Sequence, residues 1–276
     1  MEKIIATLLG LYLNTINLIS RRIGGKQSFF IFCYPFKTKI SKSKQQFLDT
    51  AEQFTLPIDD FKIQGYKWGK GPRNILFVHG WQSNAYRWRD YVESLDKTQF
   101  SIYAFDAPGH GNSGSTIGNV PLFAKGVKAM TDHVGTFESI VAHSIGGFGT
   151  FYFLHLHPEN KINKIVSLAS AFDANAFTKQ FFDRLHLSSL TKKNFLAYFK
   201  EYAGNEITYF RIDNLLDQIK SKGLIIHDQK DEVVPVTYAS QFKAIWPDAK
   251  LILTEGNGHK LRNPDILKTV CEFVTI

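Results

Sequence analysis

Short apolar runs alternate with helical patterns along most of the chain. Continuous apolar runs separated by amphipathic segments are typical of βαβ units, because helices bury both faces of a parallel sheet. The pattern predicts an α/β fold with a doubly wound, mostly parallel sheet, and a ligand site is expected at the carboxyl ends of its strands. The runs cover residues 74–78, 101–105, 138–142, 162–168, 223–227 and 250–254.

Residues 172–222 depart from this alternation. They have helical character, contain many aromatic side chains and separate the run that ends near Ala169 from the run that begins at Gly223. We interpret them as a helical cap inserted into one core of residues 45–171 and 223–276. Most of the aromatic rings are expected to fill the interior of the cap, and some are expected to select a hydrophobic acyl or alkyl group.

An amphipathic helix is predicted near the amino terminus. Residues 4–19 are apolar apart from a narrow polar stripe at helical spacing. The stretch is shorter and more polar than the about 20 apolar residues of a spanning helix, and it lacks the charge order and cleavage site of a secretory signal. Two placements stay open. The helix packs on the protein, or it lies on a membrane with Arg21, Arg22 and Lys26 at anionic head groups and residues 29–32 in the acyl boundary. The stripe consists of positions 3, 7, 10, 14, 17 and 21.

The positive charge of the chain is concentrated in residues 1–44. The formal net charge of the whole chain is +8. Residues 1–44 contain eight Lys or Arg against one Glu, so this segment carries +7 and the remainder is nearly neutral. The basic balance therefore reflects one local feature, and no nucleic-acid partner is expected.

A serine stands where an apolar strand is predicted to turn into a helix. Ser144 follows the run that ends at Ala142 and His143, and Gly146 and Gly147 follow it. A tight strand-to-helix turn of this kind exposes the serine hydroxyl and accepts only small residues two positions to either side, here Ala142 and Gly146. A buried serine that caps a helix is the alternative interpretation. The turn predicts a nucleophile and therefore an enzyme.

A serine nucleophile needs a base and a carboxylate that orients the base. The predicted strand at residues 223–228 is followed by a loop, residues 229–235, that offers carboxylates. The next predicted strand is followed by a glycine-rich loop that ends in His259. Ser, Asp and His therefore occur in the chain order of a known arrangement of this kind.

From about residue 61 to the end, the chain resembles the α/β-hydrolase family. The resemblance implies Ser144 as the nucleophile, His259 as the general base and Asp231 as the orienting carboxylate. It also implies that the backbone N–H groups of Trp81 and Ile145 form the oxyanion hole. The motifs that carry the resemblance, in family order, are Val78–Trp81, Asp106–Gly114, the serine turn, Asp228–Asp231 and Gly258-His259.

Other residues compete for these roles. Asp228 is the alternative to Asp231, although the second carboxylate of the family's Asp-x-x-Asp loop is the one that reaches the histidine. Glu232 and Asp173 are further candidates for the acid. Three histidines near the motifs are expected to order loops by hydrogen bonding rather than to transfer protons; they are His79, His110 and His143.

The sequence predicts no metal and no nucleotide cofactor. No group of His, Cys, Asp and Glu has the spacing of a metal site, and the segment 109–114 does not open a helix as a phosphate-binding loop does. Cys33 and Cys271 are too few and too far apart for a disulfide framework, so a reducing, cytoplasmic location is expected, with peripheral membrane contact as an added option.

These observations predict a serine hydrolase that cleaves a carboxylic ester through an acyl-enzyme. A carboxylesterase or a lysophospholipase-like enzyme, acting on a small molecule with a hydrophobic acyl group, fits best. Carbon–carbon bond hydrolysis and acyl transfer on the same triad are alternatives, because fold and triad do not separate these reactions. A non-catalytic, membrane-associated binding protein is the alternative outside enzymes. The resemblance disfavours a dehalogenase or epoxide hydrolase, which would carry an aspartate at the position of Ser144.

Overall fold

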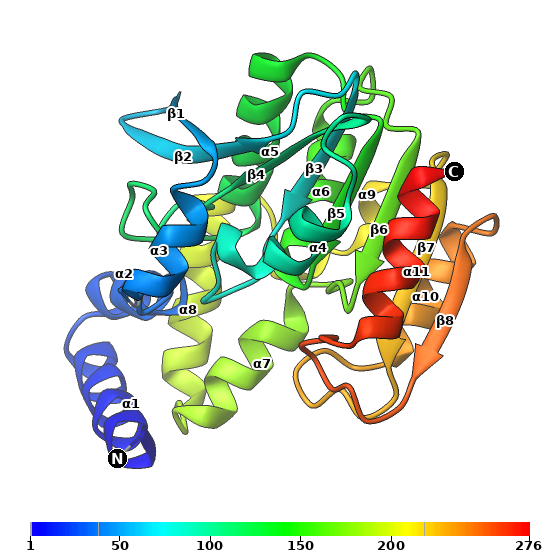
Figure 1. Cartoon of the computed structure of the whole chain (residues 1–276). Coiled ribbons are helices and arrows are strands. Elements are labelled where there is room, and N and C mark those ends of the chain that lie inside the picture. The colour runs from blue at the N-terminus through cyan, green and yellow to red at the C-terminus, as the bar shows by residue number, and fades with distance from the viewer. Residues whose placement is uncertain (1, 38, 218) are drawn as a thin grey trace. The chain divides into compact units, whose positions relative to one another are not determined.

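The computed structural model describes residues 2–37, 39–217 and 219–276, and these form two compact units (Figure 1). The helical unit contains Met1–Tyr34 and Asp173–Leu215, and the sheet unit contains Pro35–Phe172 and Leu216–Ile276. This division differs from the expected segments. Residues up to Tyr34 do not stand alone but join the insertion in one unit, whereas residues 35–44 belong to the sheet unit.

The sheet unit is built on one eight-stranded sheet in the order β1-β2-β4-β3-β5-β6-β7-β8. The strands from β4 to β8 in this order pair in parallel, as the apolar runs predict, and β2 pairs antiparallel with both β1 and β4. The strands are β1 (Glu52–Ile58), β2 (Phe61–Trp68), β3 (Arg73–Val78), β4 (Phe100–Phe105), β5 (Ser139–His143), β6 (Lys164–Leu168), β7 (Lys222–Asp228) and β8 (Lys250–Thr254).

Helices cover both faces of this sheet (Figure 1). Along β3, Phe77 points to the face where α4 and α11 lie, and its ring lies 5.0 Å from that of Trp88. On the other face, rings of α6 and α10 meet, with the centroids of Phe151 and Phe242 5.0 Å apart. Alternate residues of the central strands therefore fill two separate apolar layers. The helices are α3 (Lys42–Leu48), α4 (Arg89–Ser94), α5 (Val120–Val134), α6 (Ile145–Leu156), α10 (Thr237–Ile245) and α11 (Pro264–Thr275).

The parallel register brings the predicted site loops to one edge of the sheet. His143 at the end of β5 pairs with Leu168 of β6, and Asp228 at the end of β7 pairs with Thr254 of β8. The loops that follow β5, β7 and β8 therefore start at the same level. This is the carboxyl edge at which ligand sites of such sheets form.

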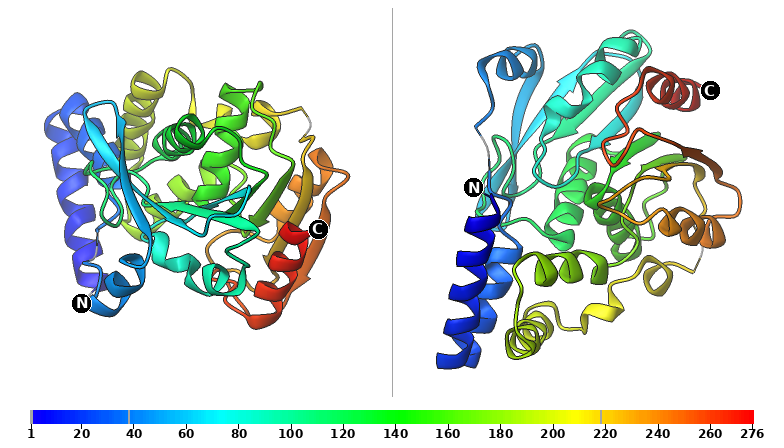
Figure 2. Two further views of the ribbon diagram at one scale, coloured as in Figure 1. Left: turned by 45° about the horizontal axis from the view of Figure 1, so that its top comes forward. Right: turned by 90° about the horizontal axis from the view of Figure 1, so that it is seen from below.

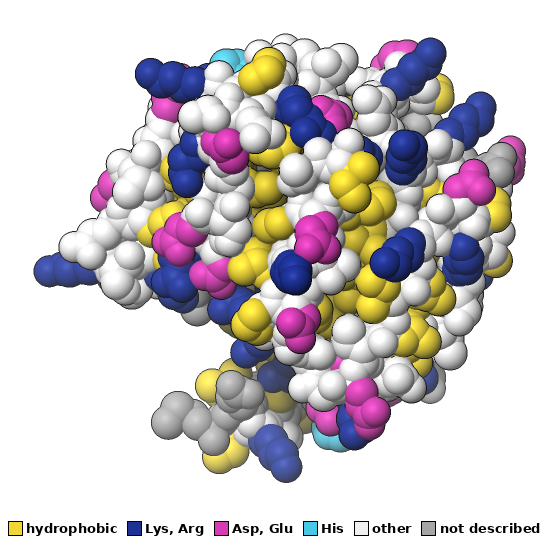
Figure 3. All heavy atoms as spheres, turned by 45° about the vertical axis from the view of Figure 1, so that its right-hand side comes forward, with side chains coloured by type: hydrophobic (Ala, Val, Ile, Leu, Met, Phe, Trp, Pro, Cys, Tyr) yellow, Lys and Arg dark blue, Asp and Glu magenta, His cyan; other side chains and the backbone are white. Residues whose placement is uncertain are grey.

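The surface charge of the sheet unit is mixed. On the face drawn in Figure 3, Lys and Arg side chains are interspersed with Asp and Glu and do not gather into one basic patch. This distribution agrees with the nearly neutral charge of the chain outside its first 44 residues.

The helical unit joins residues that are far apart in the sequence. Within it α1 and α2 lie side by side (Figure 2), and both pack on α8. None of the described helices has the length and hydropathy that a bilayer span requires. The elements are α1 (Glu2–Ile19), α2 (Arg21–Phe32), α7 (Asn175–Arg184), α8 (Ser189–Ala203), a 3₁₀ turn (Ile207–Tyr209) and α9 (Ile212–Leu215).

Aromatic rings form the interior of the helical unit. Phe29 of α2 is buried, and its ring lies 4.6 Å from that of Tyr202 and 5.5 Å from that of Tyr198, both on α8. Phe32 packs on Phe195 at 5.4 Å. Of the two placements left open by the sequence, these contacts support packing on the protein for Phe29 and Phe32, whose rings lie against the insertion and not in an acyl boundary.

Candidate active site

Ser144 occupies a strained turn between β5 and α6. Its φ of 56° and ψ of −128° lie in a region that residues with a side chain rarely adopt. A Cβ on Gly146 would lie 2.3 Å from the carbonyl oxygen of His79, and one on Gly147 would lie 1.9 Å from Ser170 Oγ. Because both residues are glycine, the start of α6 packs directly against the segments that contain His79 and Ser170. This packing holds the serine at the edge of the sheet.

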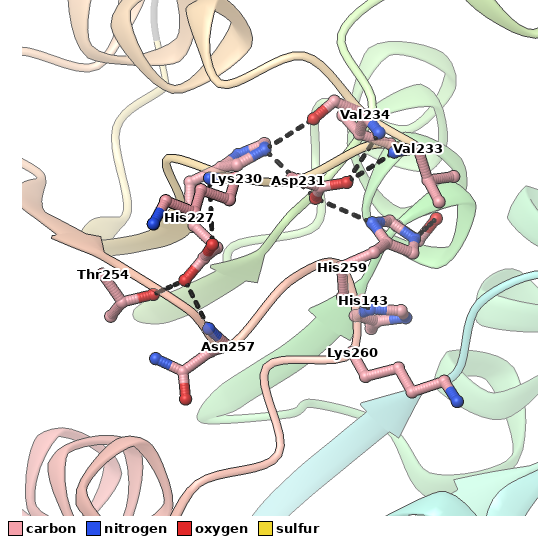
Figure 4. Close-up of polar contacts among 12 residues, drawn as sticks. His143, His227, Lys230, Asp231, Val233, Val234, Thr254, Asn257, His259 and Lys260 are labelled. Atoms are coloured by element: carbon pink, nitrogen blue, oxygen red, sulfur yellow. Dashed lines mark hydrogen bonds and ion pairs between the residues drawn. The ribbon is translucent and has the colours of Figure 1, made fainter.

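The structure brings Ser144, His259 and Asp231 together. His259 Nε2 lies 3.0 Å from Ser144 Oγ, and His259 Nδ1 lies 2.8 Å from Asp231 Oδ2. Figure 4 shows Asp231 facing His259 from the loop after β7. With the Nδ1 proton donated to the carboxylate, Nε2 is left to accept the serine proton. This is the geometry of a nucleophile with a base and an orienting group.

Asp231 is held as a charged group. Its side chain is fully buried, and its Oδ1 accepts hydrogen bonds from the N–H groups of Val233 at 2.8 Å and Val234 at 2.9 Å. Burial acts to raise the pKa of Asp231, but hydrogen bonds from His227, His259 and Val234 outweigh it and hold that pKa well below its usual range. The carboxylate is therefore ionised at neutral pH and can stabilise an imidazolium at His259.

The competing carboxylates have other partners. Asp228 accepts hydrogen bonds from Thr254 Oγ1 and Asn257 N, each at 2.8 Å, and from Lys230 N. Glu232 is exposed. Asp173 belongs to the helical unit, where it caps Ala176 and lies 3.5 Å from Arg211.

The two chain segments that are expected to supply the oxyanion hole lie next to Ser144. Ile145 is the first residue of α6, so its N–H has no carbonyl partner within the helix. Gly80, which precedes Trp81, lies so close to the nucleophile that a Cβ on it would be 3.0 Å from Ser144 Cβ. Both chain segments are thus within reach of an oxygen bound at Ser144.

A family model described as the alpha/beta hydrolase fold matches residues 73–204, which include β3 to β6 and the serine turn. The esterase EaEST from Exiguobacterium antarcticum superposes with a TM-score of 0.63 at 16% identity, over 82% of this chain and 100% of that one. The chain has the alpha/beta hydrolase fold. The non-heme chloroperoxidase CPO-A1 of Kitasatospora aureofaciens is 24% identical to this chain over 249 residues, 73% of this chain and 90% of that protein. The AB hydrolase superfamily protein YisY of Bacillus subtilis is 23% identical over 255 residues, 77% and 91% of the two chains. The matched family model and these relatives indicate an enzyme of the hydrolytic class.

Two contacts fix the backbone of the loop that carries His259. His143 Nε2 donates to the carbonyl oxygen of His259 at 2.9 Å, and Arg87 donates to that of Lys260 at 2.7 Å. Burial lowers the pKa of His143 well below its usual range, so the ring is neutral and acts as a donor only at Nε2. The motifs predict an ordering role for His143. They contain no signal for Arg87, which lies in a 3₁₀ turn (Ala85–Trp88) distant in sequence from the loop.

His227, which the sequence analysis did not identify as a site residue, contacts the carboxylate of Asp231. His227 lies at the end of β7, four residues before Asp231, and its Nε2 lies 3.4 Å from Asp231 Oδ2 and 3.0 Å from the carbonyl oxygen of Val234 (Figure 4). The spacing alone does not predict this contact, because it depends on how the loop after β7 folds back.

The histidines of the earlier motifs join loops, as expected. His79 Nε2 accepts a hydrogen bond from Ala107 N at 2.9 Å, and its Nδ1 donates to the carbonyl of Gly80 at 2.7 Å. Burial lowers the pKa of His79 to about 3, which keeps the ring neutral. His110 donates to the carbonyl of Pro108 at 2.9 Å, and burial lowers its pKa to about 4.

Asp106 organises the motif that it begins. Its carboxylate accepts hydrogen bonds from the N–H groups of Ala85 and Asn112 at 2.7 Å and from the Tyr66 hydroxyl at 3.0 Å. Burial raises the pKa of Asp106 to about 6. Gly111 has a φ of 46°, and a Cβ on it would lie 2.1 Å from Asp106 Oδ2, so only glycine fits. This motif therefore shapes a loop beside the site.

The residues that the structure describes contain no candidate metal site. Within them, no three His, Cys, Asp or Glu side chains cluster in a way that could hold a metal ion. Neither Cys33 nor Cys271 forms a disulfide.

Proposed function

We propose that this α/β-hydrolase cleaves a carboxylic ester with a hydrophobic acyl group, through an acyl-enzyme on Ser144. The observation that supports this most strongly is the continuous path from the Ser144 hydroxyl through His259 to the ionised Asp231, with links of 3.0 and 2.8 Å. The strained turn that presents Ser144 is a second support, because backbone strain of this kind is concentrated at functional sites.

The first half of the proposed reaction forms the acyl-enzyme. Ser144 Oγ attacks the ester carbonyl carbon while His259 Nε2 takes its proton. Asp231 stabilises the imidazolium by charge and through the hydrogen bond at Nδ1. The carbonyl oxygen becomes an anion beside Ile145 N–H and Trp81 N–H. Backbone donors are fixed in direction, so they stabilise this charge without reorganising. His259 then protonates the departing alcohol.

The second half releases the acid by the same groups. His259 takes a proton from water, the resulting hydroxide attacks the acyl carbon, and the tetrahedral intermediate again places its oxyanion at the two N–H groups. Collapse of the intermediate returns the proton to Ser144 Oγ. Every group in this scheme belongs to the chain, so the scheme needs no cofactor.

Carbon–carbon bond hydrolysis and acyl transfer to an alcohol use the same three side chains and remain the alternatives within enzymes. The ester reaction is favoured because it needs only the proposed triad and the two backbone N–H groups, whereas the other two reactions also need a specific group for the carbon leaving group or for the accepting alcohol. Carbon–carbon hydrolysis and acyl transfer are tested by identifying the product that the enzyme forms from a substrate suited to each reaction.

The proposal is tested by hydrolysis of p-nitrophenyl esters of increasing acyl length. In Ser144→Ala, kcat/KM should fall by roughly 10⁶-fold, as for other triads that lose the nucleophile. Ser139→Ala is the matched control. Ser139 lies on β5, and its buried hydroxyl has no partner among the described residues, so its removal should leave the rate within a factor of two or so.

Two outcomes would contradict the proposal. Equal turnover in Ser144→Ala and the wild type would remove Ser144 from the mechanism. A preference for acetyl esters over longer ones would contradict the proposed specificity for a hydrophobic acyl group. It would not contradict the proposed role of the triad.

A further inference from the structure

One face of α1 is apolar and exposed along its whole length. On a helix of 3.6 residues per turn, seven large apolar residues lie together on this face with Thr15 among them. Each keeps between 47% and 76% of its surface exposed. An exposed apolar strip of this length is a mark of an interaction surface rather than of an ordinary protein surface. We call it the outer face of α1, and it consists of Ile4, Ile5, Leu8, Leu11, Tyr12, Leu18 and Ile19.

The asparagines of the polar stripe of α1 are turned into the helical unit, whereas Lys3, Thr7 and Arg21 of the stripe are exposed. Asn14 Oδ1 accepts hydrogen bonds from Ser188 N and Thr191 Oγ1, both at 2.8 Å, at the start of α8. Asn17 is buried, donates to Ser28 Oγ at 3.1 Å and accepts from Asn194 at 3.0 Å. Leu13 is buried on the same side, so α1 has apolar residues on its inner side as well as on its exposed side. A surface helix in water normally exposes a polar side instead.

Specific contacts fix this orientation. A Cβ on Gly10 would lie 1.9 Å from the carbonyl oxygen of Leu185, so the stripe side of α1 approaches the chain more closely than any larger residue allows. Turning α1 over would break the bonds of Asn14 and Asn17 and bring larger residues against Leu185. Small residues and asparagine bonds between helices are the packing that helices use where their outer surface faces lipid.

Basic residues stand at both ends of the outer face. Lys3 precedes it, Arg21 and Arg22 follow it at the start of α2, and Lys26 lies about one turn further; all four are exposed. Glu2 is the one acidic residue of the α1 and α2 sequences. The ion pair of Arg22 with Glu201 has 3.7 Å between nitrogen and oxygen and lies in the solvent, so it leaves the arginine able to bind elsewhere.

We propose that α1 docks on an anionic lipid surface through its outer face. The helix would lie along the membrane plane, with its leucines and isoleucines among the acyl chains and Lys3, Arg21 and Arg22 at the head groups. A second copy of the chain fits less well. Two antiparallel α1 helices would place Lys3 of one copy beside Arg21 and Arg22 of the other, and two parallel helices would place each of these cations beside its own equivalent.

The proposal is tested by sedimentation of the full chain with vesicles of phosphatidylcholine and phosphatidylglycerol at 3:1, and with phosphatidylcholine alone. The wild type should bind the anionic vesicles more tightly, and less so in high salt. The double variant Leu8→Gln, Leu11→Gln should lower the partition coefficient by about 100-fold, since each leucine contributes about tenfold or more. Arg21→Gln with Arg22→Gln should lower it by about fivefold for each charge removed.

The matched control is the double variant Leu156→Gln, Leu253→Gln. These leucines are also exposed, at 49% and 45%, but belong to the sheet unit, so their replacement should leave vesicle binding unchanged. Circular dichroism and turnover of a soluble ester show that each variant is folded, and neither readout depends on lipid.

Two results would overturn the proposal. The first is wild-type binding to anionic vesicles no greater than that of the Leu8, Leu11 variant. The second is a wild-type dimer in analytical ultracentrifugation that this variant abolishes without any effect of vesicles, because the outer face would then be a contact between copies.

Discussion

Replacement of Asp231 by asparagine tests whether Asp231, and not its neighbour Asp228, is the carboxylate that orients His259. The asparagine carbonyl could still accept the hydrogen bonds of Val233 and Val234, so the loop is expected to keep its shape. Its amide would then face His259 Nδ1, where a carboxylate oxygen now lies at 2.8 Å. That arrangement favours the tautomer with the proton on Nε2, which cannot accept the Ser144 proton.

The expected loss is large and specific to catalysis. A triad with the wrong histidine tautomer loses about 10⁴ in kcat, which corresponds to about 5.4 kcal/mol of activation free energy. The assay is the steady-state hydrolysis of a p-nitrophenyl ester, with the free energy of unfolding measured in urea on the same samples. The substrate KM should change little, because Asp231 contacts the histidine and not the substrate.

Asp228→Asn is the matched control in the same loop. Asp228 accepts hydrogen bonds from Thr254, Asn257 and Lys230, and none from His259. Its replacement should lower the free energy of unfolding by about 1–3 kcal/mol while kcat stays within about tenfold. A kcat loss in Asp228→Asn equal to that in Asp231→Asn would refute the assignment, as would an Asp231→Asn variant with near wild-type turnover.

Two further predictions concern stability. Two hydrogen bonds from Arg73, of 2.6 and 2.8 Å, hold the pKa of Glu138 at about 2, below its usual value, so the pair stabilises the fold above about pH 4.5 and loses this effect as the pH falls toward 2. Glu138→Gln should therefore lower the free energy of unfolding by about 2 kcal/mol at pH 7, a figure that already allows for the partial solvent exposure of the pair. Near pH 2 the same replacement should change the free energy of unfolding by almost nothing. An equal loss at both pH values in denaturant titrations would contradict this prediction. Gly146→Ala should cost about 1–3 kcal/mol of unfolding free energy, because its methyl group would lie 2.3 Å from the His79 carbonyl; a cost near zero in denaturant titrations would count against the packing argument.

The central sheet could be predicted from the sequence because each buried strand is a continuous apolar run. All six runs are strands in the structure, with ends that differ by at most two residues or so. The hairpin of β1 and β2 was not predicted. Its residues alternate between buried and exposed positions on an edge of the sheet, and the turn between Ile58 and Phe61 depends on Asp59 with a φ of 49°. A pattern search for continuous runs does not detect such a half-exposed pair.

The site was predicted as a set of loops, and the geometry between them was not. The spacing of Asp228 and Asp231 offers either carboxylate to His259, and only the fold of the loop brings Asp231 Oδ2 to 2.8 Å. His227 and Arg87 support the site through bonds to Asp231 and to the Lys260 carbonyl. Those bonds join distant parts of the chain, and no local pattern reports them.

The amino-terminal helix was predicted as amphipathic, but its orientation could not be. Periodicity identifies a polar side and an apolar side without saying which one faces protein. In the structure Asn14 and Asn17 fix the orientation of α1, because their hydrogen bonds at α8 can form only when these two side chains face inward. The partner of that side is an insertion more than 150 residues away, which a local pattern cannot identify.

The bonds between Asn14 and Ser188 and between Asn17 and Asn194 also constrain the order of events during synthesis. At about 5–20 residues per second, α1 and α2 leave the ribosome roughly 7 to 30 s before the insertion that completes their core. During that interval Phe29, buried in the finished unit, lacks the rings of α8 on which it packs. The nascent chain therefore presents apolar helices that must wait for their partners. An early encounter with a chaperone or a lipid surface would protect them until the insertion arrives.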